Sequence, residues 1–170
     1  TTTINQSSQN LAINWQDFSI AANEAVRFNQ PNSASIVLNR VIGQSNSQIF
    51  GAMSANGQVF ILNPNGVLFG ASSQVNVGGL VASTLSLSND DFLAGKYNFA
   101  NNGGAGSITN QGTLTAAQSG YIALLAPEVM NDGIISATLG KAVLAAGDQV
   151  TLNLSQGSLL GFNIDKGAFK

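Results

Sequence analysis

Histidine and cysteine are both absent from this chain of 170 residues. Without them a thiol nucleophile, a Ser-His-Asp triad and a zinc site built from these ligands are excluded. Charge is also scarce, because six Lys and Arg and eight Asp and Glu make up only 8% of the residues. A chain this poor in positive charge is unsuited to binding nucleic acid through phosphates, or an anionic membrane through a basic helix.

Long apolar segments are missing as well. The longest apolar run covers residues 121–126, far fewer than the roughly 20 residues that a membrane-spanning helix needs. The chain opens at Thr1 in polar sequence, without the basic and apolar regions of a signal peptide. We therefore expect that a leader has been removed or that the chain is a piece of a longer protein.

Asparagine, glycine and short apolar runs are abundant instead. There are 20 Asn and 19 Gly residues, which supply hydrogen-bonding amides and turns. Apolar and polar residues alternate from Leu11 to Trp15, and Phe18 and Ile20 resume one position out of phase, which predicts a bend or bulge. The alternation places Trp15 in the core. The whole pattern predicts an all-β fold of many short strands.

Two segments differ from this pattern. Ser88 and Asp91 have the spacing of a capping box, and Gly95 would close a short helix. A polar loop explains the same residues equally well. Residues 101–106 are rich in Gly and Asn but lack the Lys and the following helix of a phosphate loop. We interpret this second segment as a flexible connector.

A repeat in the second half of the chain indicates the architecture. The segment 110–116 returns as 131–137, and the segment 120–126 returns as 140–146, with nearly the same spacing. A period of roughly 20 residues with strands this short is typical of one coil of a solenoid, which cannot bury its apolar face alone. A β-sandwich would not explain the period, so the repeat favours a parallel β-helix.

The repeat also predicts which residues stack in successive coils. Asn110 should hydrogen-bond to Asn131 along the axis through their side-chain amides. Leu124 and Leu144 should both face inward, one coil apart. The complete set of predicted apolar partners is Leu114 with Ile135, Ile122 with Ala142, and Leu124 with Leu144.

The sharpest local motif is the turn at residues 63–66. It separates the apolar runs 58–62 and 67–69, and has Asn first, Pro second and Gly fourth. This order predicts a type I turn. From the residues alone, the motif need be nothing more than a turn.

The ordered set of motifs resembles the filamentous-haemagglutinin-type two-partner-secretion (TPS) domain over essentially the whole chain. Two departures occur: Val67 stands where the family motif has Ile, and no Pro is present at residues 45–48, where a second Asn-Pro segment would fall. We take residues 1–170 as a single domain, a fragment of a longer exoprotein with a truncated N-terminal cap. The matching segments are 5–8, 13–15, 18–20, 38–41, 47–49, 55–59, 63–67, 75–84, 123–129 and 143–148.

The resemblance implies a right-handed parallel β-helix with short extra-helical β elements and with no catalytic residue, metal or cofactor. Such domains are secretion signals and folding nuclei of large Gram-negative exoproteins, here expected to be an adhesin, exported through the periplasm and outer membrane to the cell surface. The implied partner is an outer-membrane transporter with periplasmic POTRA-type domains. The implied recognition motif is Asn63, Pro64, Asn65, Gly66 and Val67, with a second candidate motif at Asn39, Arg40, Asn46, Ser47, Gln48 and Ile49.

Two other functions stay open. A polysaccharide-degrading β-helix enzyme would need a carboxylate cluster, a basic group or a calcium site. The charged candidates lie apart in the sequence, at Arg27, Arg40, Asp90, Asp91, Asp148 and Asp165. A module for host or matrix glycans, in this domain or in the downstream passenger, would use Asn, Thr and aromatic side chains. Its aromatic candidates are Trp15, Tyr97 and Tyr121.

The scarcity of charge also predicts how a transporter would bind this chain. Long-range attraction would contribute little, so salt should have little effect on binding. Short alternating segments such as 58–62 and 75–81 would add to an exposed sheet edge while they are extended. We therefore expect the folded domain to bind more weakly than the unfolded chain.

Overall fold

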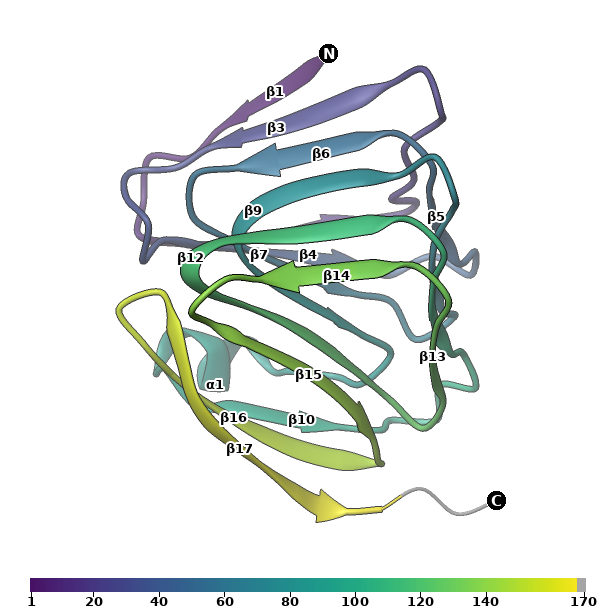
Figure 1. Ribbon diagram of the computed structural model, residues 1–170. Coiled ribbons are helices and arrows are strands. Elements are labelled where there is room, and N and C mark those ends of the chain that lie inside the picture. The colour runs from purple at the N-terminus through teal and green to yellow at the C-terminus, as the bar shows by residue number, and fades with distance from the viewer. Residues whose placement is uncertain (168–170) are drawn as a thin grey trace.

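The computed structural model describes residues 1–167, whose short strands coil around one axis (Figure 1). The first side of the coil contains β1 (Thr2–Asn5), β3 (Ala25–Asn29), β6 (Ala52–Ala55), the first halves of β9 (Gln74–Ser83) and β12 (Thr113–Ala126), and β14 (Ile134–Ala137). The second side contains β2 (Asn10–Trp15), β4 (Ile36–Val41), β7 (Gln58–Leu62), the second halves of β9 and β12, and β15 (Lys141–Ala146). The third side contains β5 (Ser47–Ile49), β8 (Val67–Phe69), β11 (Ile108–Asn110) and β13 (Val129–Asn131).

All strand pairs on these three sides are parallel, which confirms the predicted parallel β-helix. The predicted register is confirmed too, with Leu114 opposite Ile135, Ile122 opposite Ala142 and Leu124 opposite Leu144. Asn110 Nδ2 donates to Asn131 Oδ1 at 2.9 Å, as the stacking of the repeat predicted.

The stacked residues Leu124 and Leu144 differ in burial. Leu124 is fully buried, whereas Leu144 is 45% exposed. In-register partners of a parallel pair point to the same face of a sheet, so Leu144 points inward as expected. It stays accessible because, within residues 1–167, β15 pairs only with β12 and no further coil covers it.

The out-of-phase residues near the N-terminus mark a corner. β2 ends at Trp15, and the chain then turns so that Phe18 and Ile20 lie buried on the third side, where Ile20 bridges to Ile49. The predicted bend is therefore confirmed. Trp15 packs against the interior core, with its ring edge-on to Phe18 at 5.4 Å between centroids.

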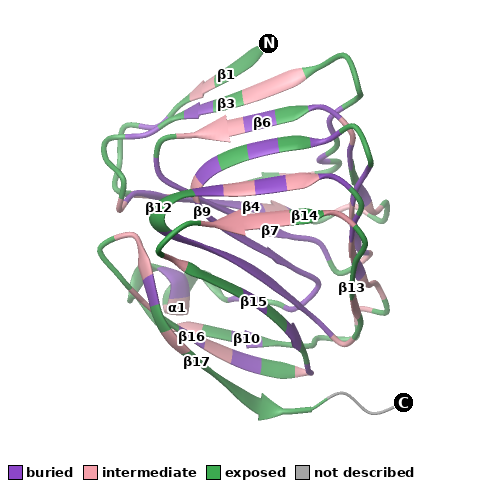
Figure 2. Ribbon diagram, viewed as in Figure 1, coloured by how far each residue is buried: buried purple, intermediate pink, exposed green. Residues whose placement is uncertain are grey.

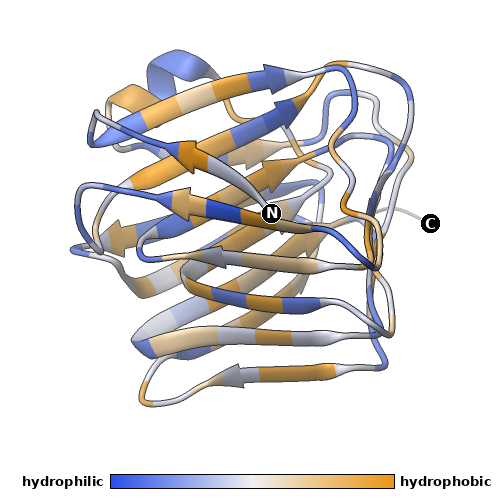
Figure 3. Ribbon diagram, turned by 90° about the horizontal axis from the view of Figure 1, so that it is seen from above, coloured by the Kyte–Doolittle hydropathy of each residue, from blue (hydrophilic) through white to orange (hydrophobic). Residues whose placement is uncertain are grey.

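Apolar residues fill the interior, and the colour bands in Figure 3 show how apolar and polar residues alternate along many of the strands. The corners between the first and second sides bring successive backbones into close contact. A Cβ atom on Gly120 would lie 1.9 Å from the carbonyl oxygen of Gly78, and one on Gly140 would lie 2.0 Å from that of Gly120. Only glycine permits this approach, which explains why Gly120 recurs as Gly140.

A second layer covers the outer face of the second side. It consists of α1 (Asn89–Leu93) and an antiparallel sheet of β10 (Tyr97–Ala100), β16 (Gln149–Ser155) and β17 (Ser158–Lys166), at the bottom of Figure 1. These are the extra-helical elements that the resemblance implied. Residues buried between this layer and the coil form a second core, which includes Leu38, Phe60 and Leu152. Most of β17 is exposed (Figure 2).

The structure decides between helix and loop at residues 88–95. Ser88 Oγ accepts a hydrogen bond from the backbone N–H of Asp91 at 3.1 Å, which caps α1. Gly95 follows the helix with φ +71°, the left-handed conformation common after a helix end. Phe92 anchors the helix in the second core.

Tyr121 is the largest side chain that is fully buried in this second core. Its hydroxyl donates a hydrogen bond to Gln58 Oε1. Burial, with a smaller contribution from Tyr97, raises the pKa of Tyr121 well above its ordinary value. The buried phenol is thus held in its neutral form.

We expect the stacked leucines to differ in their contribution to stability. Leu124→Ala should lower the free energy of unfolding by about 2–5 kcal/mol, because it leaves a cavity in the interior. Leu144→Ala should cost less than about 1 kcal/mol, since that side chain is already half exposed. Urea unfolding of both variants measures the difference, and equal losses would contradict the arrangement.

We also expect Tyr121 to make the domain sensitive to alkali. The unfolded tyrosine ionises near pH 10, whereas the folded one, whose pKa is raised, keeps its proton. This contribution to stability is therefore complete below about pH 10 and lost as the pH rises further. Tyr121→Phe should cost about 1–3 kcal/mol at neutral pH, because it leaves Gln58 Oε1 without its donor.

Urea midpoints of the wild type and Tyr121→Phe between about pH 8 and 11 test this expectation. The alkaline decline should be much shallower in the variant. The matched control is Tyr97→Phe. Burial raises the pKa of the half-buried Tyr97 less than that of Tyr121, so this variant should change the alkaline decline less. An unchanged decline in Tyr121→Phe would refute the assignment.

Candidate functional site

The predicted turn at residues 63–66 forms the corner between β7 and β8. The N–H of Gly66 donates to the carbonyl of Asn63 at 3.0 Å, and the N–H of Asn65 donates to Asn63 Oδ1 at 2.9 Å. Asn65 does not have the positive φ that a type II turn requires, whereas Gly66 has φ +114°. These observations agree with the predicted type I turn.

Side-chain amides tie this turn to the preceding coil. Asn63 is fully buried and donates from Nδ2 to the carbonyl of Ser45 and to Ser47 Oγ, both at 3.0 Å. Asn65 Nδ2 donates to the carbonyl of Gly43 at 3.0 Å. Each asparagine therefore satisfies polar groups of the corner at residues 43–47, which a carbon side chain would leave unpaired.

The other face of the turn contacts a later segment. The N–H of Gly106 donates to the carbonyl of Pro64 at 3.1 Å, and the N–H of Val67 donates to the carbonyl of Ser107 at 3.1 Å. An open hollow of about 650 Å³ lies beside them, lined by Gln44, Pro64, Asn65 and residues 102–106. The Gly-rich segment interpreted as a flexible connector is thus docked on the turn.

The second candidate motif begins on β4, where neighbouring side chains point to opposite faces. Asn39 is fully buried. Its Oδ1 accepts a hydrogen bond from Trp15 Nε1 at 3.0 Å, and its Nδ2 donates to the carbonyl of Phe60 at 3.2 Å. Asn39 is therefore inaccessible to a partner in the folded domain.

Arg40 holds the second layer to the coil. Its guanidinium donates to the carbonyl of Leu87 at 2.6 Å and to Asn89 Oδ1 at 2.8 Å. Partial burial lowers the pKa of Arg40 from its ordinary value. Arg40 thus caps a backbone carbonyl in the segment that leads into α1.

The remaining members of the second motif lie on the third side. Ser47 is buried and contacts Asn63, whereas Ile49 belongs to the interior core. Gln48 is exposed and donates from Nε2 to Asn46 Oδ1 at 3.4 Å. The structure therefore brings only Ser47 of this motif into contact with the turn at residues 63–66.

A column of buried glutamines was not predicted. Gln30 Nε2 donates to Gln6 Oε1 at 3.3 Å and to the carbonyl of Gln58 at 3.1 Å. Asn29 Nδ2 donates to Asn5 Oδ1 at 3.0 Å beside it. The signal was present in the sequence as an Asn-Gln pair that occurs at residues 5–6 and again at 29–30.

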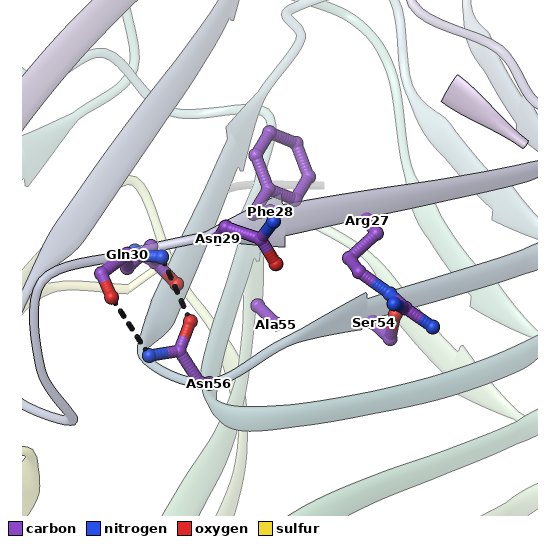
Figure 4. A pocket seen from close by; sticks show the side chains of 7 residues that line it. All are labelled: Arg27, Phe28, Asn29, Gln30, Ser54, Ala55 and Asn56. Atoms are coloured by element: carbon purple, nitrogen blue, oxygen red, sulfur yellow. Dashed lines mark hydrogen bonds between the residues drawn. The ribbon is translucent and has the colours of Figure 1, made fainter. Parts of the chain in front are cut away.

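A second hollow, of about 570 Å³, opens beside this column between β3 and β6 (Figure 4). Asn56 closes one end through paired hydrogen bonds of 2.8 Å with the backbone N–H and carbonyl of Gln30. Arg27 lies at the other end beside Ser54 (Figure 4). The lining contains no carboxylate, so it offers amide and guanidinium donors but no acid–base pair.

The features required by the two open alternatives are dispersed. Within residues 1–167, no three acidic side chains come together as a metal site, and no helix is long and apolar enough to span a membrane. Among the aromatic candidates for glycan binding, Tyr121 is fully buried and Trp15 packs on the interior core. Tyr97 is half-buried and packs edge-on against Phe60.

Comparisons with known proteins agree on one family. The profile of the TPS secretion domain matches residues 1–168. A heme/hemopexin-binding protein of Haemophilus influenzae strain Rd is 36% identical over 166 residues, which cover 92% of this chain and 18% of that protein. Another H. influenzae heme/hemopexin-binding protein is 41% identical over 97 residues, 57% of this chain and 10% of the relative.

A solved structure agrees with these matches. The crystal structure of the HMW1 secretion domain from H. influenzae has a TM-score of 0.85 at 35% identity, covering 93% of this chain and 42% of that chain. The present chain spans less than a fifth of the length of the curated relatives it matches.

We expect Gly66 to be intolerant of side chains. Gly66→Val should cost at least about 1 kcal/mol, because a β-branched residue is strained at positive φ. The matched control is Gly161→Val, since a Cβ atom on Gly161 would meet nothing within 4 Å, and it should change stability by less than about 0.5 kcal/mol. Urea unfolding compares them, and equal stability of the two variants would contradict the strain.

Proposed function

Since this chain belongs to the family of TPS secretion domains, we propose that it is the secretion signal and folding nucleus of a large exoprotein. TPS exoproteins are exported through the outer membrane to the cell surface or the medium, with an outer-membrane transporter as the partner. The observation that carries the proposal is the family match over residues 1–168, together with the fold shared with the HMW1 secretion domain.

Secretion domains of this family are non-catalytic modules, and we assign no reaction. We propose an adhesin as the exported protein.

The open end of the coil supports the role of folding nucleus. Within the described residues, β13, β14 and β15 each pair along one edge only. The inward-facing Val129 and Ile135 are only partly buried there, and Leu144 is 45% exposed. A solenoid grows through contacts between neighbouring coils, so these edges offer backbone groups and apolar surface to a further coil.

The burial of the proposed recognition motif in the folded domain supports binding by the transporter before folding is complete. In the folded domain Asn63 is fully buried and its amide is engaged by Ser45 and Ser47. The backbone edge of the motif, by contrast, is free to bind a partner until residues 106–111 pair with it. We therefore propose that POTRA-type periplasmic domains bind residues 63–67 while that segment is not yet fully packed.

We expect motif variants to impair export. Asn63→Ala and Asn65→Ala in the full-length exoprotein should lower the secreted fraction several-fold, because both remove amides that hold the proposed recognition motif in shape. Asn153→Ala is the matched control, since Asn153 is an exposed asparagine of β16, and its export should be unchanged. Secreted and periplasmic exoprotein are quantified by immunoblot, and the melting temperature of each domain variant is measured in parallel. Unchanged export of both motif variants would count against the motif as the recognition site.

A further inference from the structure

We propose that the edge of β8 that pairs with β11, with the turn at residues 63–66 before it, is a strand-addition site. An extended segment of the transporter's periplasmic domain would bind there first. The chain's own residues 104–110 then take its place as the domain folds. This inference rests on the proposed function and deepens it by naming the binding edge.

The order of the strands along the chain delays the closing of this edge. On the third side, Ser47 of β5 meets Val67 of β8, and Ile108 of β11 meets Val129 of β13, each after a single coil of the chain. Val67, however, meets its next partner, Ile108, only after about twice that length of chain. The inserted residues 84–107, which carry α1 and β10, cause the delay. If coils form in chain order, the edge of β8, like that of β9, stays open about twice as long as the edges of the earlier coils. The docking of residues 104–107 on the turn at residues 63–66 distinguishes the edge of β8 from that of β9.

The edge presents backbone groups that need a partner. In the folded domain the carbonyl of Pro64 accepts from Gly106, the N–H of Val67 donates to Ser107, and the carbonyl of Phe69 accepts from Gln111 at 2.8 Å. Before residues 104–111 arrive, these groups form an unpaired strand edge. Such an edge is a template for an added strand.

The edge is held in shape by residues that precede it. The amides of Asn63 and Asn65 donate to carbonyls at Ser45 and Gly43, in a coil already complete at that stage. Val67 and Phe69 face the interior and pair with Ser47 and Ile49 of β5, which also precede them. The edge is thus preformed while its later partner is still absent, which lowers the ordering cost of binding.

The chain's own segment and a foreign strand cannot occupy the edge together. A Cβ atom on Gly104 would lie 2.9 Å from the carbonyl oxygen of Pro64, and one on Gly106 would lie 2.3 Å from the nitrogen of Gly66. This contact leaves no room for a second backbone. Docking of residues 104–110 therefore displaces the partner, and folding itself releases the chain from the transporter.

The test compares two variants of the full chain that carry the same type of substitution, glycine to valine, at different corners. Gly106→Val should prevent the docking of residues 104–110. The matched control is Gly140→Val. A Cβ atom on Gly140 would lie 2.0 Å from the carbonyl oxygen of Gly120 in the last coil, so this variant should disturb that coil while leaving β8 paired. Amide hydrogen exchange at Val67 verifies that the edge opens in the first variant alone.

Binding is measured by titration calorimetry with the purified periplasmic domains of the transporter encoded with the exoprotein. Gly106→Val should bind about tenfold or more tightly than the wild type, because the competent open edge becomes the main species. The bound domains should protect residues 67–69 from exchange. A synthetic peptide of residues 103–111 should compete with them. Gly140→Val should bind like the wild type.

Other results would overturn the inference. Equal gains for both variants, or protection on β7 instead of residues 67–69, would show that unfolded chain in general is bound, and would leave the proposed function standing. If even the urea-unfolded chain fails to bind after dilution, the proposed function itself fails. Should Gly106→Val not fold, Thr109→Pro is the second variant, because proline in β11 removes a donor of its sheet and opens the same edge.

Discussion

Hydrogen bonding between successive coils is the constraint on which the rest of this structure depends. Strands on the three sides have their backbone partners in the coil before or after, in parallel register. The corners must therefore stack as closely as the strands do. Glycine meets this demand where backbones touch, as at Gly78 and Gly120, and amide side chains meet it where polar groups would otherwise be orphaned, as at Gln30 and Asn63.

The second layer changes what the strands beneath it can be. All five residues of β7 are buried, whereas the first half of β9 alternates between exposed and buried positions. A strand covered on both faces has a continuous apolar run, and one with a solvated face alternates. Arg40 and Tyr121 mark the boundary between the layers. Arg40 of the coil donates a hydrogen bond to the carbonyl of Leu87, just before α1. Tyr121 is buried between the layers and donates to Gln58 of the coil.

The sequence was sufficient for features that repeat and for local turns. The recurrence of residues 110–126 predicted the register of Leu124 on Leu144, and the order of Asn, Pro and Gly predicted the turn at residues 63–66. The resemblance implied elements outside the coil, but the strand pairing within the second layer was beyond reach, because β10 meets β16 through Tyr97 and Leu152, which belong to no repeat. The exposure of Leu144 follows from the departure of the chain into that layer after Ala146. The docking of Gly106 on Pro64 depends on a long insertion whose path no local pattern encodes.

The pairing of β10 with β16 also bears on how the molecule responds to mechanical force. A β-helix pulled from its ends peels coil by coil, because each coil is held by its neighbours alone. Here Ala100 is paired with Gln149, and the backbone of Asn101 is bonded to that of Asp148. Residues 101–148 are thus closed into a loop that carries no tension until this pair opens. The small antiparallel sheet acts as a clasp that shields the strands from β11 to β15 against unravelling.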